Sequence, residues 1–195
     1  MRKKNRIIII LLALMLGVTY YFPLWEISMS APQYPEGLGI SIWINNITGQ
    51  TKGDLAKINN LNHYIGMKKI NKDAIPELKY MPWIMRGLMI FGILVGLIGS
   101  RKLLLMWILA FTIMSVAGLV DYYLWGYDYG HNLDMEKAII KIPGTSYQPP
   151  LIGSKKILNF TTVSLPGVGG SVATVSLIGG YLLYYIERKR KLIKT

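Results

Sequence analysis

Four long apolar stretches constrain what this chain can fold into. They cover residues 7–25, 82–100, 103–125 and 166–186. Each is about as long as a helix needs to be to cross the hydrocarbon core of a bilayer. The last stretch is the weakest because it is rich in Gly and Ser, although small residues are common where helices touch in lipid. The pattern predicts four transmembrane helices.

The composition disfavours several classes of protein. Of the 195 residues, 52% are hydrophobic and only 16% are charged, whereas a soluble domain carries about a quarter charged residues. An ordinary water-soluble enzyme and a disordered chain are therefore disfavoured. The chain has no cysteine, which excludes disulfides, thiolate zinc sites, iron–sulfur clusters and cysteine nucleophiles.

The positions of the basic residues explain much of the formal charge of +12. Half of the Lys and Arg residues lie in three short segments on one side of the predicted helices. By the positive-inside rule this side is cytoplasmic, which predicts a multi-pass protein of the cell inner (cytoplasmic) membrane with both termini inside. Nucleic-acid binding is disfavoured because these runs lack aromatic residues that stack on bases. The residues are Arg2, Lys3, Lys4, Arg6, Arg101, Lys102, Arg188, Lys189, Arg190, Lys191 and Lys194.

The first apolar stretch has two interpretations. Residues 28–31 loosely resemble the small-residue cleavage site of a signal peptide. The stretch is long, however, and it ends in Tyr20, Tyr21, Phe22 and Trp25, which are typical of the aromatic belt at a membrane interface. An uncleaved anchor is the favoured interpretation.

The chain is expected to be mainly α: a four-helix integral membrane bundle with a small mixed extracytoplasmic cap built from two loop segments. The β-branched residues 38–44 predict a strand in the first segment, and Asp54 is expected to be the N-cap of a short helix reaching Tyr64. The predicted divisions are residues 1–25 (cytoplasmic N-terminus and first span), 26–81 (first outer segment), 82–125 (helical hairpin), 126–165 (second outer segment) and 166–195 (fourth span and basic tail).

Two features of the second outer segment are open to interpretation. An aromatic turn over residues 121–130 is expected to anchor at the membrane interface and lead to His131. Residues 142–153 have bends fixed by Pro and Gly and an exposed Tyr147. They predict either a rigid recognition loop or a lid on the cap, and the lid is slightly favoured.

The only two histidines lie in the predicted outer segments. His63 is followed four positions later by Met67, and His131 by Met135. This spacing places both side chains on one face of a helix, and in a turn it brings them towards a shared ion. Imidazole and thioether together suit copper, especially Cu(I). The four residues are therefore the candidate metal ligands.

Other interpretations of these residues stay open. A lone histidine is often a hydrogen-bonded loop residue, and the chain has ten methionines, most at packing positions. Zinc is the less favoured metal because catalytic zinc generally takes three ligands from His and carboxylate. Asp128 and Asp134 offer such carboxylates near His131, but they are equally suited to turns.

No recognisable catalytic set is present, so the protein is expected not to be an enzyme. There is no phosphate-binding Walker pattern and no Gly-x-Ser-x-Gly elbow. Arg86 and Asp121 fall near the outer ends of neighbouring spans, which predicts an ion pair that locks two helices together. A proton relay is disfavoured because no chain of further acids crosses the bilayer.

Four motifs resemble a known group of proteins. They are residues 31–39 (APQYPEGLG), 60–67 (NLNHYIGM), 127–134 (YDYGHNLD) and 146–153 (SYQPPLIG). They are similar to a family of small, mostly uncharacterised bacterial membrane proteins, often encoded beside accessory genes for nitrous oxide reductase, a copper enzyme outside the cytoplasmic membrane. The resemblance implies a role in copper supply or in maturation of an exported copper enzyme. Met135 is not a fixed element of the pattern, so the resemblance favours His63, Met67 and His131.

These observations lead to two functional hypotheses. In the first, the protein is a non-enzymatic membrane protein that binds Cu(I) and delivers it for maturation of an exported copper enzyme, with the lipid bilayer and that enzyme or its assembly factors as partners. In the alternative, it is a metal-free scaffold subunit of a membrane complex.

Overall fold

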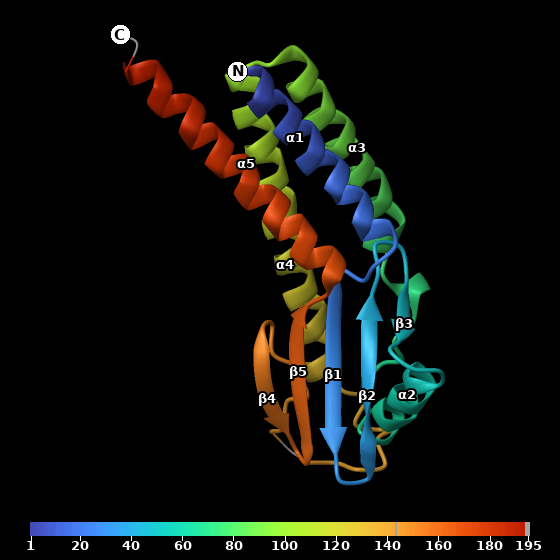
Figure 1. The fold of residues 1–195 in the computed structure, drawn as a ribbon. Coiled ribbons are helices and arrows are strands. Elements are labelled where there is room, and N and C mark those ends of the chain that lie inside the picture. The colour runs from blue at the N-terminus through green and yellow to red at the C-terminus, as the bar shows by residue number, and fades with distance from the viewer. Residues whose placement is uncertain (143, 194–195) are drawn as a thin grey trace.

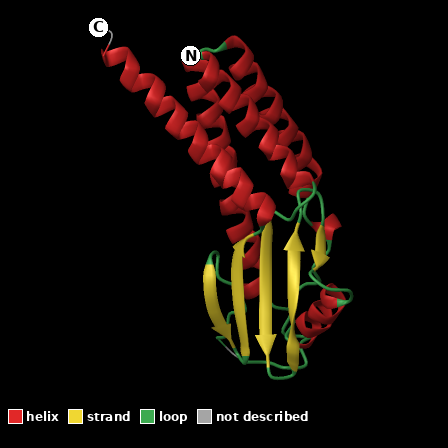
Figure 2. Ribbon diagram, in the orientation of Figure 1, coloured by secondary structure: helices red, strands yellow, loops and turns green. Residues whose placement is uncertain are grey.

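The computed structural model describes residues 1–142 and 144–193. The chain is mainly helical and carries one small antiparallel sheet (Figure 1). The long helices lie together at one end of the molecule, and the sheet and a short helix form a domain at the other (Figure 2). Both described ends of the chain lie at the helical end, far from the sheet (Figure 1).

Three helices are long and apolar enough to cross a membrane. They are α3 (Glu77–Ile98), α4 (Arg101–His131) and α5 (Val168–Ile193). They match the second, third and fourth predicted stretches and confirm that the chain has the character of a membrane protein. Ser100 begins α4 by accepting a hydrogen bond from the backbone N–H of Leu103, and Gly99 ends α3 in the left-handed conformation.

The first apolar stretch forms a shorter regular helix. The α-helix α1 (Lys3–Met15) continues as the 3-10 helix η1 (Leu16–Tyr20) and lies between α3 and α5 (Figure 1). The 13 residues of α1 span about 20 Å at the helical rise, less than the hydrocarbon core of a bilayer. The fourth membrane crossing therefore stays a prediction.

Trp107 is the centre of the helical packing. Its side chain is fully buried, and its indole N–H donates a 2.8 Å hydrogen bond to the backbone carbonyl of Leu88 on α3. Gly92 makes room for this contact, since an added Cβ would lie 2.6 Å from the Cβ of Ala13 and 2.9 Å from the Trp107 Nε1. The buried N–H is thus satisfied where water is excluded.

The five-stranded sheet joins the two outer segments. The strands are β1 (Trp25–Ala31), β2 (Tyr34–Ile42), β3 (Ile47–Gly49), β4 (Gly153–Ile157) and β5 (Phe160–Pro166). Their order is β3-β2-β1-β5-β4, all antiparallel. The strand predicted at residues 38–44 is confirmed as β2, which begins earlier because it extends into the hairpin with β1. The central strands β1 and β5 connect directly to η1 and α5.

The two faces of the sheet differ in burial. One face carries Ile27, Leu38 and Ile40, which pack with Ile58 of α2 (Asp54–Tyr64) and Tyr129 of α4 into one core. The opposite face, here called the open face, carries the exposed residues Ser28, Ser30, Ser154, Lys156 and Thr161. A short 3-10 helix, η2 (Lys72–Ala74), precedes α3. Along the strands, buried and exposed residues alternate with the two-residue period of a strand.

The prediction of an aromatic turn over residues 121–130 is wrong, because α4 continues as a helix to His131. Tyr122, Trp125 and Tyr129 are three and four positions apart and therefore share one helix face. All three pack against the core of the sheet domain, and successive rings in this row lie 6.3 Å and 4.6 Å apart. Tertiary packing of this stripe outweighs the low helix propensity of Gly126 and Gly130.

Ser164 joins three elements where the chain passes between the two halves. Its hydroxyl is completely buried, accepts a 2.8 Å hydrogen bond from Trp25 Nε1 and lies 2.9 Å from the hydroxyl of Tyr122. It also donates to the carbonyl of Leu151. Tyr122 must then be the donor, and the hydroxyl uses its proton and both lone pairs.

Residues 144–152 form a lid rather than an exposed recognition loop. The expectation that Tyr147 is exposed is wrong, since only 5% of its surface is accessible. Its backbone N–H donates to the carbonyl of Gly130, and Gln148 lies directly against Gly130. Glycine at this helix position allows the lid to reach the α4 backbone.

The predicted ion pair between Arg86 and Asp121 is not formed. The Arg86 guanidinium instead lies over Trp83, 4.8 Å from the ring centroid, and 5.7 Å from that of Tyr20. These are cation–π contacts. The ion pairs of the described residues, which all lie in the sheet domain, are Lys57–Glu36, Lys68–Asp128 and Lys137–Asp134.

The contact between α4 and the lid is tested by two glycine substitutions. In Gly130→Ala, the added Cβ overlaps backbone atoms of Gln148, so we expect a loss of about 1–3 kcal/mol from overpacking. In Gly126→Ala, the nearest atom is 3.9 Å away, and the better helix propensity of Ala makes the change neutral or stabilising. Thermal unfolding of both variants in the same detergent measures the difference; equal melting temperatures would contradict it.

Candidate functional site

Both histidines lie in the last turn of a helix and are exposed. His63 is near the end of α2, with its ring 6.4 Å from that of Tyr64. His131 is the last residue of α4; its Nδ1 lies 3.1 Å from the carbonyl of Tyr127, and its ring stacks on the Tyr127 ring at 4.1 Å. A histidine at this position interacts favourably with the free carbonyls of a helix C-terminus.

The two methionines follow the helices and do not share their faces. Gly66 takes a left-handed conformation after α2, and the N–H of Met67 bonds back to the carbonyl of Asn62. The chain reverses there, and Met67 packs against the core of the sheet domain. Met135 follows the end of α4 and is 37% exposed. The histidine and methionine of each pair therefore do not share a helix face. In the sequence, Gly66 was the signal that α2 ends before Met67.

The structure nevertheless brings the two histidine segments together. The N–H of Asp134 donates a 2.8 Å hydrogen bond to the carbonyl of Gly66, and the N–H groups of Ile139 and Ile140 donate to the carbonyl of Tyr64. These bonds join the loop after α2 to the loop after α4. Tyr64 and Gly66 are next to His63 and Met67, and Asp134 is next to Met135.

The nearby carboxylates have other partners. Asp128 accepts a 2.6 Å hydrogen bond from Lys68 Nζ and another from Asn132. Asp134 accepts from Lys137 Nζ at 2.9 Å and from two backbone N–H groups of its own turn. Within residues 1–142 and 144–193, no three His, Asp or Glu side chains are grouped so that they could hold one metal ion.

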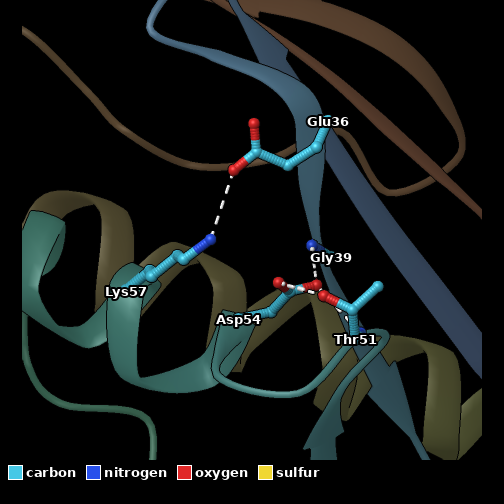
Figure 3. Close-up of polar contacts among 5 residues, drawn as sticks. All are labelled: Glu36, Gly39, Thr51, Asp54 and Lys57. Carbon is cyan, nitrogen blue, oxygen red and sulfur yellow. Dashed lines mark hydrogen bonds and ion pairs between the residues drawn. The ribbon is translucent and has the colours of Figure 1, made fainter.

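A polar cluster in the sheet domain surrounds the buried side chain of Asp54 (Figure 3). Its side chain is 1% exposed and accepts hydrogen bonds from the N–H of Gly39 on β2, at 3.1 Å, and from the N–H and hydroxyl of Thr51. Asp54 was expected to be the N-cap of α2; that place is taken by Gly53, in the left-handed conformation. Asp54 instead joins the first turn of the helix to the sheet.

The environment of Asp54 fixes its ionisation. Burial alone would raise the pKa of this carboxyl, but the hydrogen bonds from Thr51 and Gly39 outweigh burial and lower it. Both carboxylate oxygens already accept hydrogen bonds. Asp54 is therefore a structural link between β2 and α2, and its oxygens are not free for a metal or a substrate. The nearby pair of Lys57 and Glu36, 3.2 Å apart (Figure 3), is exposed and contributes little.

No known protein-family model matches this chain, and no curated protein matches it at a meaningful level. The resemblance to the membrane proteins encoded near nitrous oxide reductase accessory genes therefore stays a prediction. The function has to be argued from the geometry of the helices and the sheet domain.

The role of Asp54 is tested by Asp54→Asn across pH. At neutral pH the variant should lose about 1–3 kcal/mol, because buried N–H donors lose a charged acceptor. The folded-state pKa is below the unfolded value of about 3.9, so the stabilisation is present above that value and is lost as the pH falls through the folded-state pKa. Denaturant unfolding between about pH 6 and about pH 2, on either side of the unfolded value, should therefore show a weaker acid dependence in the variant.

The matched control is Asp73→Asn, which changes an exposed aspartate in η2. Its unfolding free energy and pH dependence should follow those of the unmodified protein. If Asp54→Asn and the unmodified protein lost stability in parallel as the pH falls, the carboxylate of Asp54 would not be the group that links β2 to α2.

Proposed function

We propose that this protein is a scaffold subunit that holds a small sheet domain at a fixed orientation on the outer face of the cytoplasmic membrane, where it docks another membrane complex. The observation that carries the proposal is the unbroken path of α4 from the apolar bundle into the domain. In this proposal four helices, α1 with η1 and then α3, α4 and α5, cross the bilayer.

Three connections support a rigid attachment of the domain. The helix α4 enters it without a break, β1 begins five residues after η1 ends, and β5 is followed after one residue by α5. Gly167 and Gly169 donate backbone hydrogen bonds to the carbonyls of Leu24 and Pro23, so the incoming and outgoing chains are tied together. A domain held at several points cannot swing as one on a flexible linker does.

The charge distribution supports the proposed orientation. The basic residues flanking the bundle lie at the end away from the sheet, beside the described termini. Several are fixed there: Arg6 Nε donates to the carbonyl of Gly96, and Arg101 donates to that of Glu187. The side chain of Glu187 accepts from Asn5 Nδ2 and from the N–H of Arg2. By the positive-inside rule this end faces the cytoplasm and the sheet domain faces out.

The open face of the sheet supports a docking role. No helix is packed over this face (Figure 1), which carries exposed Ser and Thr residues, whereas residues of the opposite face form the core with α2 and α4. Ser28 on this face is hydrogen-bonded to the side chain of Gln50. A rigidly oriented polar surface of this kind is suited to meeting a partner at a constant height above the membrane.

The docking role is tested by photo-crosslinking in cells. A photoreactive amino acid at Ser28 or Ser154 on the open face should give one discrete crosslinked partner. The same substitution at Asn60, an exposed residue of α2 on the covered side of the sheet, is the matched control and should give none. Equal crosslinking from all three positions, or none from the open face, would contradict the proposal.

A second candidate function is copper handling. Its support is the set of three backbone hydrogen bonds that join the segments after His63 and His131. In this proposal His63, Met67, His131 and Met135 bind Cu(I) and deliver it to an exported copper enzyme. Met67 would have to turn away from the core, since it now packs there.

Copper handling is tested by metal analysis of the purified protein loaded with Cu(I). The proposal expects stoichiometric copper that is lost in His63→Ala and in His131→Ala, because each removes an imidazole ligand. Met106→Ala, at an exposed position in the membrane bundle, is the control for nonspecific thioether binding. Copper that stays stoichiometric in both histidine variants would remove this site.

A further inference from the structure

A hollow of about 320 Å³ is lined by residues of the β1–β2 and β4–β5 hairpins. These hairpins lie at the end of the sheet farthest from the long helices (Figure 1). The hollow is formed where they turn, side by side (Figure 1). The polar residues that line it are Ser30, Tyr34, Lys156, Asn159 and Thr161. The ring of Tyr34 packs with Phe160 against the core of the domain. The hollow is shallow and open to solvent, and its volume would hold a small ligand.

The strand register aligns three of these groups. Ser30 of β1 is paired with Thr161 of β5, and Thr161 is paired with Lys156 of β4. Paired residues point to the same face of a sheet, so two hydroxyls and one ammonium form a straight row on the open face. No carboxylate is among the described residues that line the hollow. The row is therefore a set of hydrogen-bond donors around one positive charge.

The backbone around the hollow departs from regular geometry on both sides. Leu158, in the two-residue turn between β4 and β5, has a φ of 54°, a left-handed conformation that a leucine rarely takes, and its side chain is 46% exposed. In the other hairpin, Met29 pairs with Leu38 and Ala31 with Tyr34, so the single residue between Met29 and Ala31 lies opposite three residues of β2. Such departures concentrate at binding sites.

We infer that this hollow is a binding site for a carboxylate-bearing ligand, with Lys156 Nζ paired to the carboxylate and Ser30, Thr161 and Asn159 donating hydrogen bonds around it. The carboxylate comes either from a small acidic sugar or from an acidic side chain of a partner; the chemistry is the same in both cases. The inference does not rest on the scaffold role, because a ligand site at this end is compatible with any function of the helices.

Lys155 provides a control within the same strand. It is adjacent to Lys156 but points to the opposite face, where its Nζ donates a 3.1 Å hydrogen bond to the carbonyl of Gln148 in the lid. Substitution of either lysine removes the same charge from the same strand. Only Lys156 lies in the hollow, so only its loss should affect binding.

The test is isothermal titration of the purified full-length protein in detergent with three probes: glucuronate, glucose and a hexaglutamate peptide. We expect saturable binding of glucuronate or hexaglutamate, and none of glucose, which lacks the carboxylate. Lys156→Ala should raise the Kd about tenfold or more, since a charge-assisted hydrogen bond is lost. Lys155→Ala should leave the Kd within about twofold, as expected for an exposed charge on the opposite face of the sheet that is screened by solvent.

The outcomes separate the alternatives. Binding of glucuronate identifies a small acidic ligand, and binding of hexaglutamate alone identifies an acidic segment of a partner. Equal binding of glucose and glucuronate, equal effects of the two lysine substitutions, or no saturable binding of either acidic probe would overturn the inference. Crosslinking from Ser28 and Ser154 is independent of these results, so failure here is distinguishable from failure of the scaffold proposal.

Discussion

The hydroxyl of Ser164 is the contact on which the relation between the bundle and the sheet depends. It collects hydrogen bonds from Trp25, at the start of β1, and from Tyr122, on α4, and it donates to Leu151 in the lid. Each of these groups is at a point where the chain leaves the apolar bundle or closes over the domain. A hydroxyl with three partners in a buried site has one stable arrangement, because any displaced partner would leave a polar group unsatisfied. The orientation of the sheet relative to α4 is therefore set by polar contacts as well as by packing.

The aromatic stripe on α4 extends this constraint along the helix. Tyr122, Trp125 and Tyr129 would be placed at a membrane interface by composition alone, but they face the core formed by the strands and α2. The helix thus uses its apolar surface in two ways: towards lipid and neighbouring helices around Trp107, and towards protein beyond Tyr122. The lid completes the second environment, since Gly130 allows its backbone to approach the helix and Tyr147 to become buried.

These contacts explain which parts of the fold could be predicted from the sequence and which could not. The apolar stretches were long enough to identify α3, α4 and α5, and β-branched residues identified β2. The end of α4 was missed because a stripe of aromatic residues does not reveal whether its partner is a lipid headgroup or a strand far away in the sequence. Asp54 was expected to contact only its own helix, since its bond to Gly39 depends on how β2 is placed. The histidine and methionine pairs failed as helix-face pairs for a local reason: Gly66 ends α2 before Met67, and α4 ends before Met135.

The edge strand β4 and the open face also explain how the domain avoids associating with copies of itself. A sheet with an uncovered face and a free edge at β4 is exposed to pairing with other strands. The edge strand has adjacent lysines, Lys155 and Lys156, directed to opposite faces, and the open face is rich in hydroxyls rather than apolar groups. Both features oppose pairing and burial between identical domains. They leave a hydrated surface, and in the scaffold proposal this is the surface that meets the partner. The same lysine that protects the edge also places a positive charge at the hollow, so resistance to self-association and recognition of an acidic ligand are served by one side chain.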